Sequence, residues 1–87
     1  MNHLELFERI RIIRQFKGVT QTFVATELGM TISNYNMKEN GKRPIKTFEL
    51  EAIAKALGEP VAIFFDENIH VKLNVGKSAK SERKEVG

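Results

Sequence analysis

Residues 20–42 read TQTFVATELGMTISNYNMKENGK, a pattern typical of two short helices joined by a tight turn. Thr20 and Thr31 each precede a run without helix breakers, and a threonine hydroxyl there can cap a helix by accepting an unpaired backbone N–H. Gly29 ends the first run, because glycine adopts the left-handed conformation at no steric cost. The elements predicted here are two helices and a closing turn: residues 21–28, residues 32 to about 39, and Asn40-Gly41.

Apolar residues in these two helices recur at spacings that place them on one side. Val24, Ala25 and Leu28 share a face of the first helix, while Met30 and Tyr35 add apolar contacts from the turn and from the second helix. The two helices can therefore pack on each other.

The segment before this pair predicts a first helix over residues 4 to about 17. Its apolar side chains recur on one stripe, with an aromatic side chain beside it: Leu6, Ile10, Ile13 and Phe7. We interpret Arg9, Arg11 and Arg14 as a solvated face of this helix, with phosphate binding as the alternative. Val19, in the short link that follows, is expected to fill the space between the first two helices.

The segment after the pair predicts two more helices. The fourth helix starts at Lys46 or Thr47, and its apolar stripe follows the i, i+3, i+4, i+7 pattern: Leu50, Ile53, Ala54 and Leu57. Pro60 suits the first turn of a short fifth helix over residues 61–65, which would close the core.

Several residues of this pattern also occur in a known family at the same spacings. They are a small residue, a glycine four positions later, two apolar residues and a closing acidic-Asn-Gly turn: Ala25, Gly29, Met30, Tyr35 and Glu39-Asn40-Gly41. This stretch resembles the helix-turn-helix of the phage Cro/repressor and Xre family of DNA-binding proteins. Residues 9–21 and 42–58 are similar to the family's flanking helices, so the likeness covers about residues 6 to 65. It implies an all-α, five-helix, phage-repressor-like domain.

The resemblance implies that the second helix of the motif enters the major groove of DNA. Base reading is implied for side chains near the start of that helix: Ile32, Ser33, Asn36 and Met37. An asparagine can pair bidentately with adenine, and an apolar side chain can touch a thymine methyl, although Ile32 and Met37 could instead pack in the core. Contact with the DNA backbone is implied for polar and basic residues around the motif: Gln21, Thr31, Asn34, Asn40, Lys42, Arg43 and Lys46.

Two residues of the motif need a separate interpretation. The family usually has an apolar residue where Lys38 stands, so we expect the lysine stem to lie along the core with its ammonium group in water. Phe23 comes one residue before the core position Val24, and we expect it to cover the first helix, with partial exposure as the alternative.

Residues 67–76 change to a period of two, which predicts a half-buried β-strand or extended segment after the helix-turn-helix domain of residues 1–66. Its apolar positions are Ile69, Val71, Leu73 and Val75. A single strand needs a partner, and we predict that it pairs with the same strand of a second copy to form a homodimer. Folding back over its own domain is the alternative. Residues 77–87 are polar and mixed in charge, as expected of a flexible tail.

Composition limits the classes of function. The 87 residues allow one small domain, and 14 Lys and Arg against 11 Asp and Glu give a net charge of +3, which permits nucleic-acid binding without requiring it. Cysteine is absent, and no apolar run approaches the roughly 20 residues of a membrane span, so we expect a cytoplasmic protein. The histidines stand alone and no Gly-rich phosphate loop occurs, so we expect no catalysis, no metal site and no cofactor.

Two functions follow from these patterns. The first is a sequence-specific transcriptional regulator, a small dimeric repressor of phage, plasmid or mobile-element type that binds a palindromic operator and occludes a promoter. The second is an antitoxin-like or antagonist-controlled module whose C-terminal strand binds a different protein. An isolated chain that stays monomeric would favour the second function.

Overall fold

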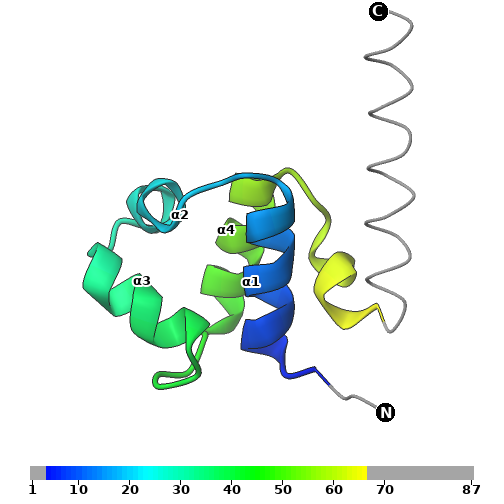
Figure 1. Cartoon of the computed structure of the whole chain (residues 1–87), viewed down its shortest axis with the longest axis horizontal. Coiled ribbons are helices and arrows are strands. Elements are labelled where there is room, and N and C mark those ends of the chain that lie inside the picture. The colour runs from blue at the N-terminus through cyan, green and yellow to red at the C-terminus, as the bar shows by residue number, and fades with distance from the viewer. Residues whose placement is uncertain (1–3, 67–87) are drawn as a thin grey trace, which may run out of the picture.

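A computed structural model describes residues 4–66 of the chain, which form four α-helices and one short 3-10 helix. In chain order they are α1 (Leu6–Phe16), α2 (Gln21–Leu28), α3 (Ile32–Glu39), α4 (Thr47–Leu57) and the 3-10 helix η1 (Val61–Phe65). Helices α1 and α4 lie in the middle, with α2 and α3 on one side and η1 on the other (Figure 1). Helix α2 packs on α3 and α4, while η1 lies against α1 and α4.

Local sequence signals set the bounds of α2 and α3 as predicted. The Thr20 hydroxyl accepts a hydrogen bond from the Phe23 amide at 3.0 Å, and the Thr31 hydroxyl accepts one from the Asn34 amide at 3.1 Å. Gly29 ends α2 with a φ of 70°. These bonds satisfy backbone N–H groups that a helix start leaves without an intrahelical partner.

The prediction of five α-helices is wrong, because residues 61–65 form a 3-10 helix. Here the Ile63 amide bonds the Pro60 carbonyl three residues back, at 3.0 Å. So short a segment has room for few i to i−4 bonds, and the tighter i to i−3 pattern suits it. The predicted strand over 67–76 and the tail over 77–87 lie outside the described residues, and residues 4–66 contain no strand.

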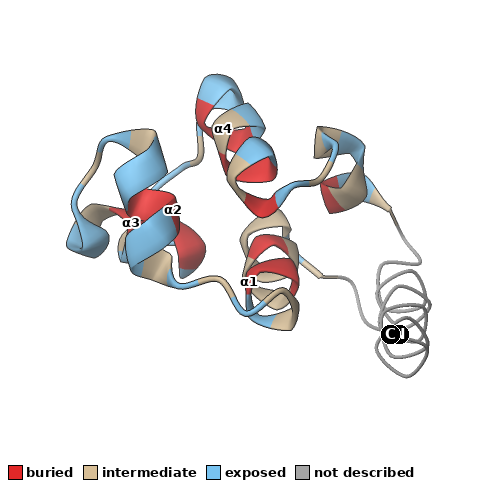
Figure 2. Cartoon of the chain, turned by 90° about the horizontal axis from the view of Figure 1, so that it is seen from above, coloured by how far each residue is buried: buried red, intermediate tan, exposed pale blue. Residues whose placement is uncertain are grey.

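The core sits where the inner faces of the helices meet, and Figure 2 shows the buried positions on those inner faces. Its members come from every helix: Ile10, Ile13, Val24, Ala25, Tyr35, Leu50, Ile53, Ala54, Leu57 and Phe64. The predicted apolar stripes of α1, α2 and α4 are therefore confirmed, and Val19, Leu28 and Met30 pack against this core as partly buried side chains. Phe23 differs from the prediction, because 47% of it is exposed on the outer side of α2.

A buried ion pair shows that the prediction for Lys38 is wrong. This lysine is 6% exposed, and its Nζ lies 3.0 Å from Glu49 Oε1 and donates to the Pro44 carbonyl at 2.9 Å. The ammonium group is therefore not in water, because Glu49 in the first turn of α4 supplies its countercharge. A buried charge persists when it is paired and hydrogen-bonded in this way.

Candidate nucleic-acid interface

The first turn of α3 is exposed at the surface of the motif. Thr31, Ile32 and Ser33 are exposed, with 48% of Ile32 accessible, and Asn36 is exposed one turn further along. Asn34 and Met37 are partly buried. Of the residues predicted to read bases, Ile32, Ser33 and Asn36 thus stand at the surface, and their contact with bases stays a prediction.

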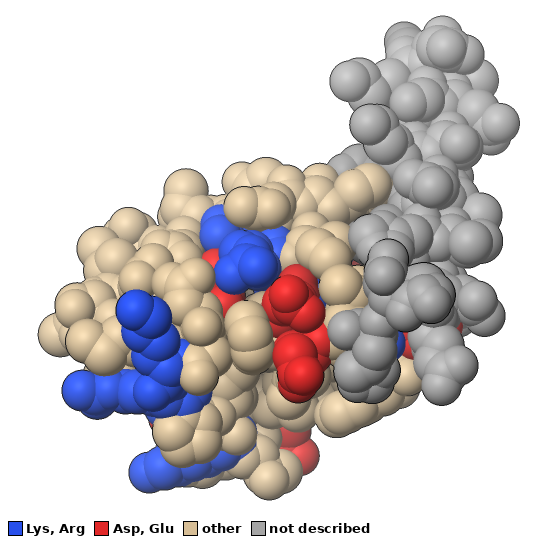
Figure 3. All heavy atoms as spheres, turned by 60° about the horizontal axis from the view of Figure 1, so that its bottom comes forward, with Lys and Arg blue, Asp and Glu red and all other residues tan. Residues whose placement is uncertain are grey.

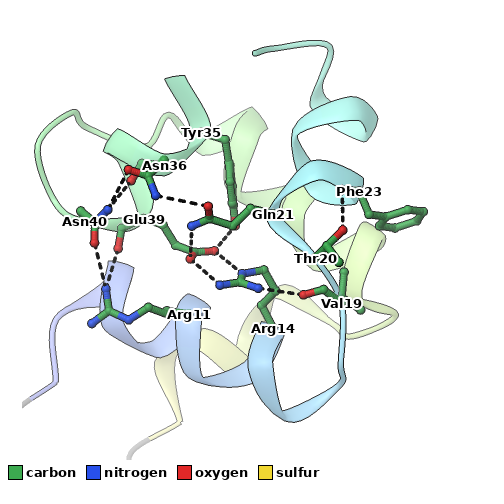
Figure 4. Close-up of polar contacts among 10 residues, drawn as sticks. All are labelled: Arg11, Arg14, Val19, Thr20, Gln21, Phe23, Tyr35, Asn36, Glu39 and Asn40. Atoms are coloured by element: carbon green, nitrogen blue, oxygen red, sulfur yellow. Dashed lines mark hydrogen bonds and ion pairs between the residues drawn. The ribbon is translucent and has the colours of Figure 1, made fainter. Parts of the chain in front are cut away.

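The opposite side of α3 is fixed by charges that the sequence analysis missed. Glu39 is 1% exposed, and its carboxylate accepts two hydrogen bonds from the Arg14 guanidinium, at 2.7 and 3.0 Å. It also accepts bonds from the Tyr35 hydroxyl at 2.6 Å and from Gln21 Nε2 at 2.9 Å. Figure 4 shows these four side chains meeting from three helices, so one carboxylate joins α1, α2 and α3.

The titration of this cluster follows from its bonding. Burial alone would raise the pKa of Glu39, but the bonds from Arg14, Tyr35 and Gln21 outweigh burial and hold that pKa below its ordinary value. The bond to Glu39 raises the pKa of Arg14 in spite of burial. Burial, together with the bond to Glu39, raises the pKa of Tyr35, so its hydroxyl stays a donor. The carboxylate is charged and the guanidinium protonated in the folded protein.

The prediction that the arginines of α1 form a solvated face is wrong, because their side chains bond groups within the protein. Arg14 is 9% exposed, and its Nη1 also donates to the Val19 carbonyl at 2.8 Å. Arg11 donates to the Glu39 carbonyl at 3.1 Å and to Asn40 Oδ1 at 3.3 Å, and Arg9 donates to the Leu4 and Asp66 carbonyls. Arg14 stands four residues after Ile10, on the core stripe itself, and this spacing was the signal for its burial.

A chain of side-chain amides connects the buried carboxylate to the exposed face of α3. Gln21 Oε1 accepts from Asn36 Nδ2 at 3.2 Å, while Asn40 Nδ2 donates to Asn36 Oδ1 at 3.1 Å and to the Asn36 carbonyl at 2.9 Å. Figure 4 shows Gln21 between Glu39 and Asn36. Gln21 and Asn40, predicted to contact the DNA backbone, thus carry hydrogen bonds within the protein.

Basic side chains follow α3 in the loop before α4. Lys42, Arg43 and Lys46 are exposed, and Arg43 Nη1 donates to Asn34 Oδ1 at 3.2 Å, which holds the guanidinium beside α3. Figure 3, which brings the lower side of Figure 1 forward, shows basic side chains on the part of this face where α3 and the loop lie. The structure thus brings the predicted basic residues next to the exposed turn of α3.

A family model described as Helix-turn-helix matches residues 10–64. The chain belongs to this helix-turn-helix family. Comparisons with curated proteins and with solved structures returned no match. Membership of this family supports the prediction that the chain is a DNA-binding transcriptional regulator.

Residues 4–66 hold neither a candidate metal site nor a membrane-spanning helix. This part of the chain has no group of His, Asp and Glu arranged to hold a metal ion. It also has no helix with the length and apolar character needed to cross a membrane. The candidate site consists of the exposed first turn of α3 and the basic loop beside it.

Proposed function

We propose that this helix-turn-helix protein is a sequence-specific repressor that inserts α3 into the major groove of an operator. The observation that carries the proposal is the division of α3 into two faces. Tyr35, Lys38 and Glu39 anchor one face through buried bonds, and Ile32, Ser33 and Asn36 stand exposed on the other. A reading helix needs both, because base contacts depend on side chains held in a fixed frame.

The exposed side chains offer the chemistry that base edges recognise. A serine hydroxyl bonds base edges or phosphates, an asparagine amide matches adenine, and an isoleucine can pack on a thymine methyl. The face supports readout that combines hydrogen bonds at Ser33 and Asn36 with an apolar contact at Ile32. Met37, which is partly buried, would add to this contact at its edge.

The basic loop supports binding that does not depend on sequence. Lys42, Arg43 and Lys46 are exposed next to α3, where their charges would pair with phosphates and set the register of α3. Thr31 and Asn34, at the start of α3, are proposed to contact the sugar-phosphate backbone of the DNA. We propose that the regulator acts in the cytoplasm.

We propose further that two copies bind one palindromic operator and block a promoter. Two-fold protein symmetry matches a palindrome when the half-sites lie about 34 Å apart along the duplex. The residues proposed to join the copies, Ile69, Val71, Leu73 and Val75, lie outside the described residues, so the support is the alternation in the sequence. Changing Leu73 to Asp should yield monomers in sedimentation equilibrium, and a dimer that survives the change would place the contact elsewhere.

The test of the reading role is selection from a random pool of duplex DNA, followed by titration of variants on the selected and a shuffled duplex. Changing Ser33 or Asn36 to Ala should cost about 1–3 kcal/mol on the selected duplex and leave binding to the shuffled one unchanged. Equal losses on both duplexes would remove that residue from the reading set. A wild-type chain that selects no sequence would contradict the proposed function.

A further inference from the structure

The hydrogen bonds around Asn36 run in one direction from α1 back to the buried carboxylate. Arg11 Nη1 donates to Asn40 Oδ1 at 3.3 Å, and Asn40 Nδ2 donates to Asn36 Oδ1 at 3.1 Å. Asn36 Nδ2 then donates to Gln21 Oε1 at 3.2 Å, and Gln21 Nε2 donates to Glu39 Oε1 at 2.9 Å. We refer to Arg11, Asn40, Asn36, Gln21 and Glu39 as the amide relay.

The two ends of the amide relay determine which way each amide faces. A guanidinium has only donors, so Asn40 must turn its oxygen toward Arg11. An ionised carboxylate has only acceptors, so Gln21 must turn its NH2 group toward Glu39. Both ends therefore require the same orientation of the Asn36 side chain: its oxygen must face Asn40 and its NH2 group must face Gln21. Reversing any one amide would bring two donors or two acceptors together.

Asn36 keeps bonding capacity for a further partner. An amide carries two N–H donors and two acceptor lone pairs, and the relay uses one of each. The remaining N–H and the remaining lone pair sit on an exposed residue of the proposed reading face. Adenine offers N7 as an acceptor and N6–H as a donor in the major groove, which complements such an amide in one orientation only.

We propose that the amide relay makes Arg11 and Gln21 positioning residues, which fix the polarity of Asn36 for reading adenine on one strand. The inference rests on the proposed function and names the base and the residues that orient its reader. Water can satisfy a reversed amide in the free protein, but a base-edge contact excludes that water, so a reversed Asn36 then leaves polar groups unpaired. The relay thereby discriminates A·T from T·A at the base pair that Asn36 contacts.

The test compares single base-pair changes in the selected duplex across variants of the full chain. The base pair read by Asn36 is the one whose preference disappears in Asn36→Ala, where we expect a preference of about tenfold in the wild type. Gln21→Met and Arg11→Met each leave one end of the relay in place and should lower the preference at that one pair only in part, whereas the double variant Arg11→Met with Gln21→Met breaks both ends and should reduce it to below about threefold. Gln15→Met makes the same change at an exposed glutamine of α1 and should leave the preference intact.

A merely structural role predicts other results. If the double variant Arg11→Met with Gln21→Met weakens binding to every duplex alike, or leaves the preference at that pair intact, the relay does not orient Asn36. In the double variant Gln21→Met with Asn36→Ala, affinity for the selected duplex should be no lower than in Asn36→Ala alone, and multiplied losses of affinity would contradict the relay.

A change in the DNA gives a readout that is independent of variant folding. Replacing the adenine by 7-deazaadenine removes the N7 acceptor, so wild-type binding should weaken about tenfold, while binding by Asn36→Ala should not change. Equal weakening of both proteins would overturn the inference and leave the proposed function standing. A wild type without any sequence preference would contradict the proposed function itself, and the relay's reading role with it.

Discussion

At the scale of single residues, Glu39 joins three helices, because its carboxylate accepts hydrogen bonds from side chains of α1, α2 and α3. Its carboxylate is buried and accepts bonds from Arg14, Tyr35 and Gln21, so it couples the position of α3 to those of α1 and α2. A buried carboxylate of this kind is stable only while all these partners remain, because desolvation opposes its charge. Affinity for DNA should therefore depend on Glu39 although its side chain is inaccessible.

Replacing Glu39 by Gln should destabilise the fold by about 3–5 kcal/mol, because it leaves the Arg14 guanidinium buried without its countercharge. The matched control is Glu51→Gln, since Glu51 is exposed on α4, and it should change stability by no more than about 0.5 kcal/mol. Urea unfolding followed by circular dichroism measures both. Similar losses in the two variants would contradict the role of the ion pair.

Acid should destabilise the domain through Glu39 and Glu49. Bonds to Lys46 and Lys38 hold the pKa of Glu49 below the ordinary value of 4.5 although burial opposes this, and the pKa of Glu39 is lowered likewise. Between the folded and unfolded pKa values the unfolded chain binds more protons, so stability rises with pH. The stability that Glu39 and Glu49 contribute is fully present above about pH 5. It is lost as the pH falls through the pKa values of the two carboxyl groups in the folded protein. Urea midpoints measured from pH 7 to pH 3 should show this fall, and the double variant Glu39→Gln, Glu49→Gln should show a shallower one.

At the scale of elements, the start of α3 depends on one hydroxyl. Thr31→Ala removes the acceptor of the Asn34 amide and should cost about 1 kcal/mol of stability. Thr26 is an exposed threonine inside α2, and Thr26→Ala should be neutral or slightly stabilising, because alanine favours the helix interior. Thermal unfolding of the two variants compares these effects, and an unchanged melting temperature in Thr31→Ala would contradict the capping role.

The turn after α3 is packed more tightly than the turn before it. Gly41 has a φ of +76°, and an added Cβ would lie 2.6 Å from the Phe7 ring, whereas Gly29, with a φ of +70°, has open space. Gly29→Ala should cost about 1–2 kcal/mol from the left-handed backbone alone. Gly41→Ala should cost about 1 kcal/mol or more beyond that, since it also clashes with Phe7. Equal losses would show that the ring moves aside freely.

At the scale of the whole molecule, the features predicted correctly from the sequence are those whose signals lie within a few residues of one another. The bounds of α2 and α3 follow from threonine caps and a glycine, and the core stripes follow from helical spacing. The ion pairs were missed because each joins residues that are distant in sequence, 25 positions apart for Arg14 and Glu39. Periodicity places Arg14 on the core stripe of α1, but only the packing of α1 on α3 supplies the carboxylate that makes burial possible.

Binding of the whole domain to DNA should depend strongly on salt. Changing Lys42 and Arg43 to Ala should weaken binding to selected and shuffled duplexes alike and reduce the slope of log K against log salt by about two, since each phosphate contact contributes about 0.9. Lys55, an exposed lysine in the last turn of α4, is the matched control, because that turn is at the far end of α4 from the basic loop. An unchanged slope in the double variant would place the phosphate contacts elsewhere.

The central claim is that α3 is the element that reads DNA, and amide chemical-shift mapping by NMR tests it most directly. The isotope-labelled full chain is titrated with the selected duplex and, separately, with a shuffled one. We predict that the largest differences between the two complexes fall on residues 31–37, while residues 41–46 shift with both duplexes. Differences centred on η1 or on the outer face of α4, with residues 31–37 unchanged, would contradict the account.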